Sequence, residues 1–166
     1  MTKLFYPFIL IAVFPFLTTY GQSKTLTEDA VIIKELVQFN KSYFSAYNEC
    51  NVEKLTSICT KDIEFYHDLG GALFGIESLS NQIEKFCDSD YSTIADYSNV
   101  KTFILRNRAE VYGGIITGEL SFTSKNKSDG AEKFLGTSKY TLVLSNQSNL
   151  WKISRFLSYD HQSDSN

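Results

Sequence analysis

The sequence predicts an α+β domain in which three N-terminal helices pack on a strongly curved antiparallel sheet. Apolar residues recur at helical spacing in the N-terminal part of the chain, whereas the second half holds long segments of alternating apolar and polar residues. Helices followed by a run of antiparallel strands place the helices on one face of a sheet. With 166 residues, 43% of them hydrophobic and 14% aromatic, the chain suits one domain with a substantial core.

The first 21 residues have the pattern of a signal peptide. Lys3 supplies a positive charge, and the apolar run over residues 4–17 suits a signal peptide but is too short for a membrane span. The small residues Thr19 and Gly21 predict cleavage after Gly21; the alternative is an uncleaved membrane anchor. We therefore expect an exported protein, periplasmic or secreted, that leaves the membrane once the signal is removed. The rest of the chain divides into a polar leader (22–27), a single domain (28–161) and a disordered tail (162–166).

Three helices are expected from apolar periodicity and capping residues. Thr27 is a candidate N-cap for a first helix that runs to about Glu49, with acidic residues in its first turn. Asn51 is a candidate N-cap for a short second helix, and a third is expected over residues 76–86.

Five strands are expected from alternation and from turn residues between the segments. They cover residues 63–68, 100–106, 109–124, 133–144 and 151–159. The polar segment 87–98 is expected to be irregular, and the pair Gly113 and Gly114 to bend the third of these strands.

The two histidines of the chain each end a predicted strand beside an aspartate. His67 precedes Asp68, and His161 follows Asp160. An imidazole exchanges protons near neutral pH, and a carboxylate within reach orients it, so His67 and Asp68 are candidate catalytic residues. The alternatives are a buried His67 bound to a backbone or tyrosine partner, an exposed terminal His161, and an Asp68 that binds the turn at Gly70 and Gly71.

Strand alternation predicts that both strand ends line one interior cavity. Phe65 and His67 share the inner face of their strand, and Arg155 and Tyr159 share the apolar face of the last strand. Arg155 there either pairs with an acid or binds an anionic ligand, and pairing is favoured because an unpaired buried charge is very costly. The helical wall is expected to contribute tyrosines that otherwise belong to the core, namely Tyr43 and Tyr47.

Several segments resemble the nuclear transport factor 2-like superfamily, the cone fold shared by ketosteroid isomerase, scytalone dehydratase and SnoaL-like proteins. They are FSAYN (44–48), IEFYHD (63–68) with the glycines that follow, and WKI (151–153), within a match over about residues 28–161. The ending LSYDH (157–161) looks like a branch of small SnoaL-like proteins without assigned function. This fold hosts enzymes, ligand binders and association modules alike.

The resemblance implies catalytic roles for two residues, but a third catalytic group of the family has no equivalent in this chain. The catalytic aspartate of ketosteroid isomerase corresponds to His67 here, and its oxyanion tyrosine corresponds to Tyr43. Its second oxyanion donor, a carboxylic acid, falls near Thr137 and Ser138, where this chain has no acid. The resemblance therefore does not imply steroid isomerisation itself.

Charge and cysteine content exclude some functions. The net charge is −3 and no basic run stands out, so we expect no nucleic-acid partner. Cys50, Cys59 and Cys87 are expected to be small buried residues, with Cys59 and Cys87 in helices, although an exported chain permits one disulfide. None of them has the spacing of a zinc site, and we expect neither a metal nor a cofactor.

Three classes of function fit these features. The first is an enzyme that isomerises, dehydrates or cyclises a small organic molecule by cofactor-independent general acid/base chemistry. The second is a non-catalytic binder of a small apolar or weakly acidic molecule, and the third is a module for dimerisation or partner docking. A homodimer is expected in any case, since the outer face of the sheet would expose Leu135, Val143 and Phe156.

Overall fold

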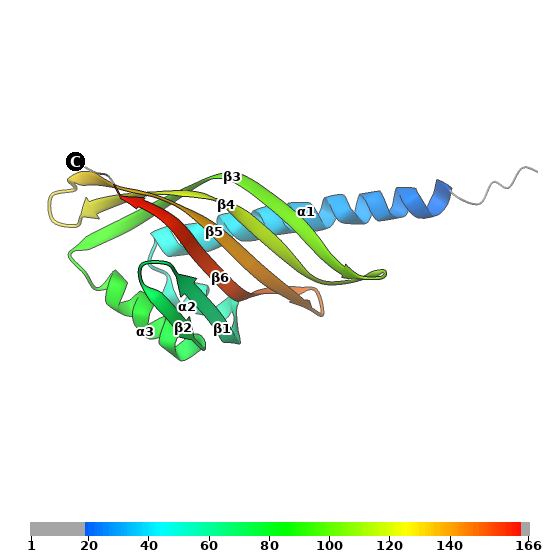
Figure 1. Cartoon of the computed structure of the whole chain (residues 1–166), viewed down its shortest axis with the longest axis horizontal. Helices are drawn as coiled ribbons and strands as arrows, with labels where there is room; N and C mark the ends of the chain where they lie inside the picture. Colours follow the sequence, from blue (N-terminus) through cyan, green and yellow to red (C-terminus); the bar gives the residue numbers. More distant parts are fainter. Residues whose placement is uncertain (1–18, 164–166) are drawn as a thin grey trace, which may run out of the picture.

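The computed structural model describes residues 19–163, and these form an α+β domain, as predicted (Figure 1). The helices are α1 (Thr19–Asn48), α2 (Val52–Ser57) and α3 (Ile76–Cys87), and the strands are β1 (Cys59–His67), β2 (Gly71–Phe74), β3 (Tyr91–Asn107), β4 (Glu110–Asn126), β5 (Glu132–Gln147) and β6 (Leu150–Ser163). The helices do not form one N-terminal group, because β1 and β2 lie between α2 and α3.

The six strands form one curved sheet in the order β2-β1-β6-β5-β4-β3. Four of the pairs are antiparallel, but β1 and β6 run parallel, so the expectation of a wholly antiparallel sheet is wrong at this pair. A parallel pair needs a long crossover connection, and here α3 and the strands β2 to β5 provide it. The crossover brings the C-terminal ends of β1 and β6 side by side.

Two stretches of strand were not expected from the sequence. Residues 91–98 belong to β3 and pair along their length with residues 119–126 of β4, although their polar composition predicted irregular structure. The four-residue β2, most of it exposed, pairs with the end of β1. In both cases the pairing with a neighbouring strand outweighs weak local signals.

The first helix begins earlier than predicted. Thr27 is not its N-cap, because α1 begins at Thr19 and continues through the expected cleavage position after Gly21. The apolar run 4–17 of the expected signal peptide lies outside the described residues. Of the expected tail, Gln162 and Ser163 belong to β6 and the rest lies outside the described residues. No helix in the described part of the chain is both long and apolar enough to span a membrane.

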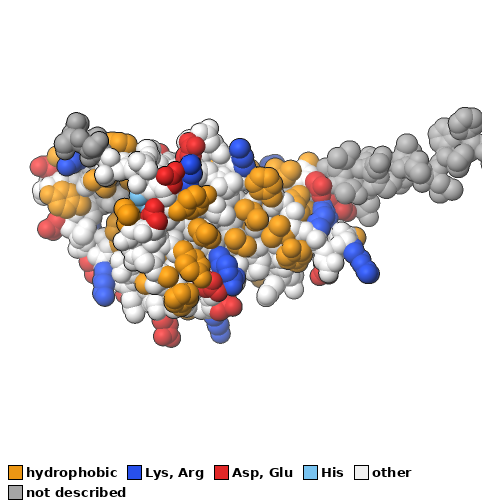
Figure 2. Space-filling model, in the orientation of Figure 1, with side chains coloured by type: hydrophobic (Ala, Val, Ile, Leu, Met, Phe, Trp, Pro, Cys, Tyr) orange, Lys and Arg blue, Asp and Glu red, His pale blue; other side chains and the backbone are white. Residues whose placement is uncertain are grey.

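Helix α1 packs along one face of the sheet, over β3 and β4 (Figure 1). Leu36 is fully buried against Gly114, where an added Cβ would lie 3.0 Å from the Leu36 side chain. The hydroxyl of the fully buried Tyr140 donates a 2.9 Å hydrogen bond to Asn40, which joins β5 to α1. The face turned away from α1 carries hydrophobic side chains with charged ones between them (Figure 2).

A disulfide joins the C-terminal ends of α1 and α3. It connects Cys50 to Cys87, whose Cα atoms are 5.7 Å apart, so the alternative of one disulfide holds, rather than the favoured interpretation of three small buried residues. Asn51 caps α2 as predicted, by accepting a hydrogen bond from the Lys54 backbone. Cys59 is free and buried, at the start of β1 rather than in a helix.

Candidate functional site

An apolar cavity of about 250 Å³ lies between the inner face of the sheet and the helices α1 and α3. Most of its wall is aromatic or aliphatic, and none of the described residues that line it is Lys, Arg, Asp or Glu. The residues of interest in the wall are Tyr43, Tyr47, Phe65, His67, Phe156 and Ser158. A cavity of this composition suits a neutral, mainly apolar molecule, oriented by a few polar groups.

A more open hollow of about 300 Å³ adjoins this cavity at the ends of β1 and β6. The two spaces share Tyr47, His67, Phe86 and Phe122, and the hollow is also lined by His161. His67 therefore lies where the hollow meets the cavity, and both histidines face the same entrance.

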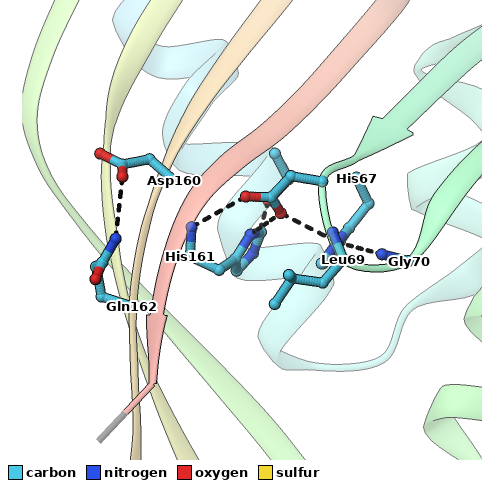
Figure 3. A network of polar contacts seen from close by, with 8 residues as sticks. His67, Leu69, Gly70, Asp160, His161 and Gln162 are labelled. Atoms are coloured by element: carbon cyan, nitrogen blue, oxygen red, sulfur yellow. Dashed lines mark hydrogen bonds and ion pairs between the residues drawn. The ribbon is translucent and has the colours of Figure 1, made fainter.

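His67 is held at the turn between β1 and β2 as a neutral imidazole. Its Nδ1 atom accepts hydrogen bonds from the backbone N–H groups of Leu69 and Gly70, at 3.2 and 3.0 Å (Figure 3). The ring fits because Gly70 has no Cβ, which would lie 3.3 Å from it, and because Gly71 adopts a positive φ of 82°. An accepting Nδ1 leaves the proton of the neutral ring on Nε2.

Electrostatics favour the same neutral state. Partial burial and the neighbouring His161 lower the pKa of His67, and Asp68 opposes them with a smaller effect. His67 therefore offers an N–H donor at neutral pH. The Gly70 amide of the turn that Asp68 was expected to bind donates to His67 instead.

Asp68 and His161 form a directly hydrogen-bonded pair that links the turn after β1 to the C-terminal part of β6. One carboxylate oxygen accepts from the His161 backbone N–H at 3.2 Å, and the other pairs with Nδ1 of the ring. Burial pushes the pKa of Asp68 up, but the hydrogen bonds from the backbone and ring of His161 outweigh it and lower that pKa. On the far side of the ring, Nε2 lies 3.3 Å from the Ser158 hydroxyl.

The two imidazole rings are stacked, with centroids 4.2 Å apart and planes inclined by 15°. His67, Asp68 and His161 offer ligand atoms within 4.8 Å of one another, the spacing of a possible metal site. Nδ1 of His67 already accepts the amides of the turn, and Nδ1 of His161 already pairs with Asp68, so a cation here would compete with these hydrogen bonds.

Two irregularities in β6 decide which of its side chains face the cavity. Leu144 pairs with Ile153 but Val143 pairs with Arg155, so one extra residue is inserted in β6 at this point. Such a bulge moves the following residues to the opposite face. Phe156 and Ser158 consequently line the cavity, and the expectation of Phe156 on the outer face is wrong.

The same bulge places Arg155 and Tyr159 outside the cavity, contrary to the prediction. Arg155 pairs with Glu64 at 2.7 Å, so the favoured alternative of an acid partner is confirmed. The pair lies on the outer face of the sheet, however, and not on the cavity-facing side as expected. Tyr159 is 37% exposed and shares a shallow outer hollow with Tyr66. His67 also borders this outer hollow, but Tyr159 does not line the interior cavity.

A second irregularity turns His161 inward. Asp160 has a positive φ of 60°, and the register between β5 and β6 shifts beside it. His161 and Ser158, three residues apart, therefore contact each other. Ser158 was not singled out from the sequence, because strict alternation separates residues three apart onto opposite faces and no sequence signal marks this bulge.

Tyr43 and Tyr47 contribute hydroxyl groups to the helical wall. Burial raises the pKa of Tyr43 well above its ordinary value, with smaller contributions from Cys59 and Tyr47, and burial raises the pKa of Tyr47 to about 12. Both hydroxyls therefore stay protonated, and neither has a hydrogen-bond partner among the described residues. They are available as donors to a bound molecule.

Several solved structures of other proteins share this architecture. A ketosteroid isomerase-like protein from Erwinia carotovora atroseptica superposes with a TM-score of 0.59 at 13% identity, over 81% of this chain and 96% of that one. An NTF2-like protein with a cystatin-like fold from Novosphingobium aromaticivorans gives 0.60 at 14% identity, over 86% and 88%. ActVI-ORFA from Streptomyces coelicolor gives 0.65 at 12% identity, over 79% and 97%.

These similarities define the class of protein by fold. The chain shares the cystatin-like fold of these ketosteroid isomerase-like and NTF2-like structures, the fold that the sequence segments suggested. No family model matches the sequence. No curated protein matches it either, so the site must be interpreted from its own geometry.

Proposed function

We propose that this protein is a cofactor-independent enzyme that moves protons on a small, neutral and largely apolar organic molecule. The observation that carries the proposal is the hydrogen-bonded pair of His161 and Asp68 beside the neutral N–H of His67 at an apolar cavity. Isomerisation, dehydration and cyclisation all need a base and a donor in this arrangement. The structural similarity to a ketosteroid isomerase-like protein agrees with such chemistry.

His161 has the features of the base. Asp68 binds its Nδ1, which fixes the tautomer in which Nε2 accepts a proton, and the negative carboxylate stabilises the imidazolium that forms. His161 lines the open hollow together with His67, so a molecule bound there contacts both rings.

His67 and Tyr43 have the features of the electrophilic side of the site. The Nε2–H of His67 and the protonated hydroxyl of Tyr43 can donate to a substrate carbonyl oxygen as negative charge develops on it. Because the wall holds no Lys or Arg, these neutral donors suit a neutral substrate.

The proposal is tested by deuterium exchange from D₂O into the acidic C–H positions of a panel of neutral cyclic ketones, followed by NMR. We expect His161→Gln and Asp68→Asn to slow enzyme-dependent exchange by about 100-fold or more, because both remove the oriented base. Asp160→Asn is the matched control, since Asp160 neighbours His161 in the chain but pairs with Lys139 on the exposed surface. Equal exchange in all four proteins would contradict the proposal.

Non-catalytic binding of the same class of molecule is the second candidate, favoured by the apolar wall of the cavity. Calorimetry separates the two. Binding of ligands that undergo no exchange, with unchanged affinity in Asp68→Asn, would support the binder and contradict the enzyme.

We also propose that the protein is exported and acts as a homodimer. The disulfide between Cys50 and Cys87 supports export, because disulfides persist in oxidising compartments. The exposed Tyr66 and Tyr159 on the outer face of the sheet support pairing of two copies there. A mature chain that keeps Met1, or a monomer in sedimentation at high protein concentration, would contradict the respective proposal.

A further inference from the structure

Ser158, His161 and Asp68 are connected as a nucleophile, a base and an orienting acid. The Ser158 hydroxyl lies 3.3 Å from Nε2 of His161, and Nδ1 of the same ring pairs with the Asp68 carboxylate. Each ring nitrogen therefore faces the partner that a serine nucleophile requires: the hydroxyl on one side and the carboxylate on the other. Such a set is recognised by its geometry and roles, and a distance slightly above 3.2 Å is common without substrate.

The nucleophile position opens into the cavity. Ser158 is only 5% exposed, yet it lines the apolar cavity, so its hydroxyl is accessible to a molecule bound inside and shielded from bulk water. Asp68 is fixed from the other side as well, because its backbone N–H donates to the carbonyl of Ser158 at 3.2 Å. The two strand ends thus hold acid and nucleophile in register.

We propose that Ser158 is an acyl-accepting nucleophile and that the protein cleaves small, neutral aryl esters through an acyl-serine intermediate. Ser158 Oγ attacks the ester carbonyl carbon while its proton passes to Nε2 of His161. The bond from that carbon to the aryl oxygen then breaks, and the leaving phenol takes the proton from His161. A water molecule, deprotonated by His161, attacks the acyl-serine, releases the carboxylic acid and restores the Ser158 hydroxyl.

The wall of the cavity selects this class of ester. Its aromatic side chains and the absence of Lys, Arg, Asp and Glu among its described residues exclude charged esters and favour an aromatic group. The N–H of His67 and the Tyr43 hydroxyl, both in the same wall, are the donors for the oxyanion. An aryl leaving group also departs more easily than an alkyl one, which reduces the demand on these donors.

The inference goes beyond the proposed proton transfer, although both use His161 and Asp68. The purified full chain is mixed with p-nitrophenyl acetate, release of p-nitrophenol is followed by absorbance, and the protein is then digested for mass spectrometry. We expect rapid release accompanied by one acetyl group on the peptide that contains Ser158. In Ser158→Ala the acetyl group should be absent and the release rate should fall by at least about 100-fold.

Ser154→Ala is the matched control. Ser154 lies on the same strand and donates to the Val143 carbonyl, and its variant should react as the unmodified protein does. If Ser158→Ala does not fold, His161→Gln keeps the inference testable, because it should prevent acetylation of Ser158 without altering the serine. An acetyl group only on Tyr or Lys side chains, or release that is equal in all variants, overturns the inference.

The outcome separates this inference from the proposed proton transfer. Deuterium exchange by a protein that never acylates Ser158 retains the proton-transfer enzyme and rejects the esterase. Acylation of Ser158 in a protein that promotes no deuterium exchange retains the esterase and rejects the proton-transfer enzyme.

Discussion

Removal of the disulfide between Cys50 and Cys87 should destabilise the protein and loosen the wall of its cavity. The two cysteines are 37 residues apart, and closing a loop of this length restricts the unfolded chain by about 4 kcal/mol at 25 °C. Helix α3 has no fully buried residue, yet Leu79, Ile83 and Phe86 of this helix line the cavity. The tether is therefore a large part of what holds α3 in place.

The variant Cys50→Ser/Cys87→Ser tests this expectation. Its free energy of unfolding, from urea denaturation, should fall by about 4 kcal/mol relative to the oxidised protein. Amide hydrogen exchange should accelerate most in α3, because that helix loses its anchor while the sheet keeps its pairing. Reduction of the unmodified protein should give the same loss, and the reductant should have no effect on the variant. A loss below about 1 kcal/mol, with α3 still protected, would refute the reasoning.

Three further predictions concern single side chains. The pKa of His67 in the folded protein lies below its unfolded value of about 6.5, so its contribution to stability is present above that pH and is lost as the pH falls through the folded pKa. The thermal stability of His67→Gln should therefore decline less than that of the unmodified protein as the pH falls over this range. An identical decline would contradict the assignment. Phe156→Ala should cost about 2–4 kcal/mol in urea denaturation and change ligand affinity, because Phe156 packs on Tyr43 in the cavity wall; unchanged affinity would place the ligand elsewhere. Arg155→Ala should lower the free energy of unfolding by no more than about 1 kcal/mol and leave deuterium exchange intact, because the pair with Glu64 is on the outer surface. Loss of exchange in this variant would show that Arg155 takes part in the site.

Apart from the hydroxyls of Tyr43 and Tyr47 on α1, the polar groups of the site come from the C-terminal parts of β1 and β6 and from the turn after β1. His67 is the last residue of β1 and Asp68 follows it, whereas Ser158 and His161 lie in the C-terminal part of β6, and the two strands run parallel. Parallel neighbours bring their C-terminal ends to the same edge of a sheet. The site therefore depends on the crossover that makes β1 and β6 neighbours, and this parallel pairing is one that a wholly antiparallel sheet cannot contain.

The sequence by itself determined the α+β class, the capping of α2 by Asn51, and the inward direction of Phe65 and His67. These features follow from local rules, namely periodicity, capping and strand alternation, and each needs only a few neighbouring residues. The sequence also indicated that both histidines belong to strand ends beside aspartates. The sequence led us to expect a hydrogen bond between Asp68 and the turn at Gly70, whereas Nδ1 of His67 accepts the hydrogen bond from the Gly70 amide.

Only the tertiary structure decided which residues of the last strand reach the cavity. One inserted residue before Arg155 and a positive φ at Asp160 shift the register of β6 against β5. The first shift exchanges Tyr159 for Ser158 in the wall, and the second brings His161 to Asp68. A bulge forms where strand pairing, twist and packing across the sheet require it, and these requirements come from residues distant in the sequence. For that reason the alternation that correctly placed His67 on β1 misplaced Arg155 and Tyr159 on β6.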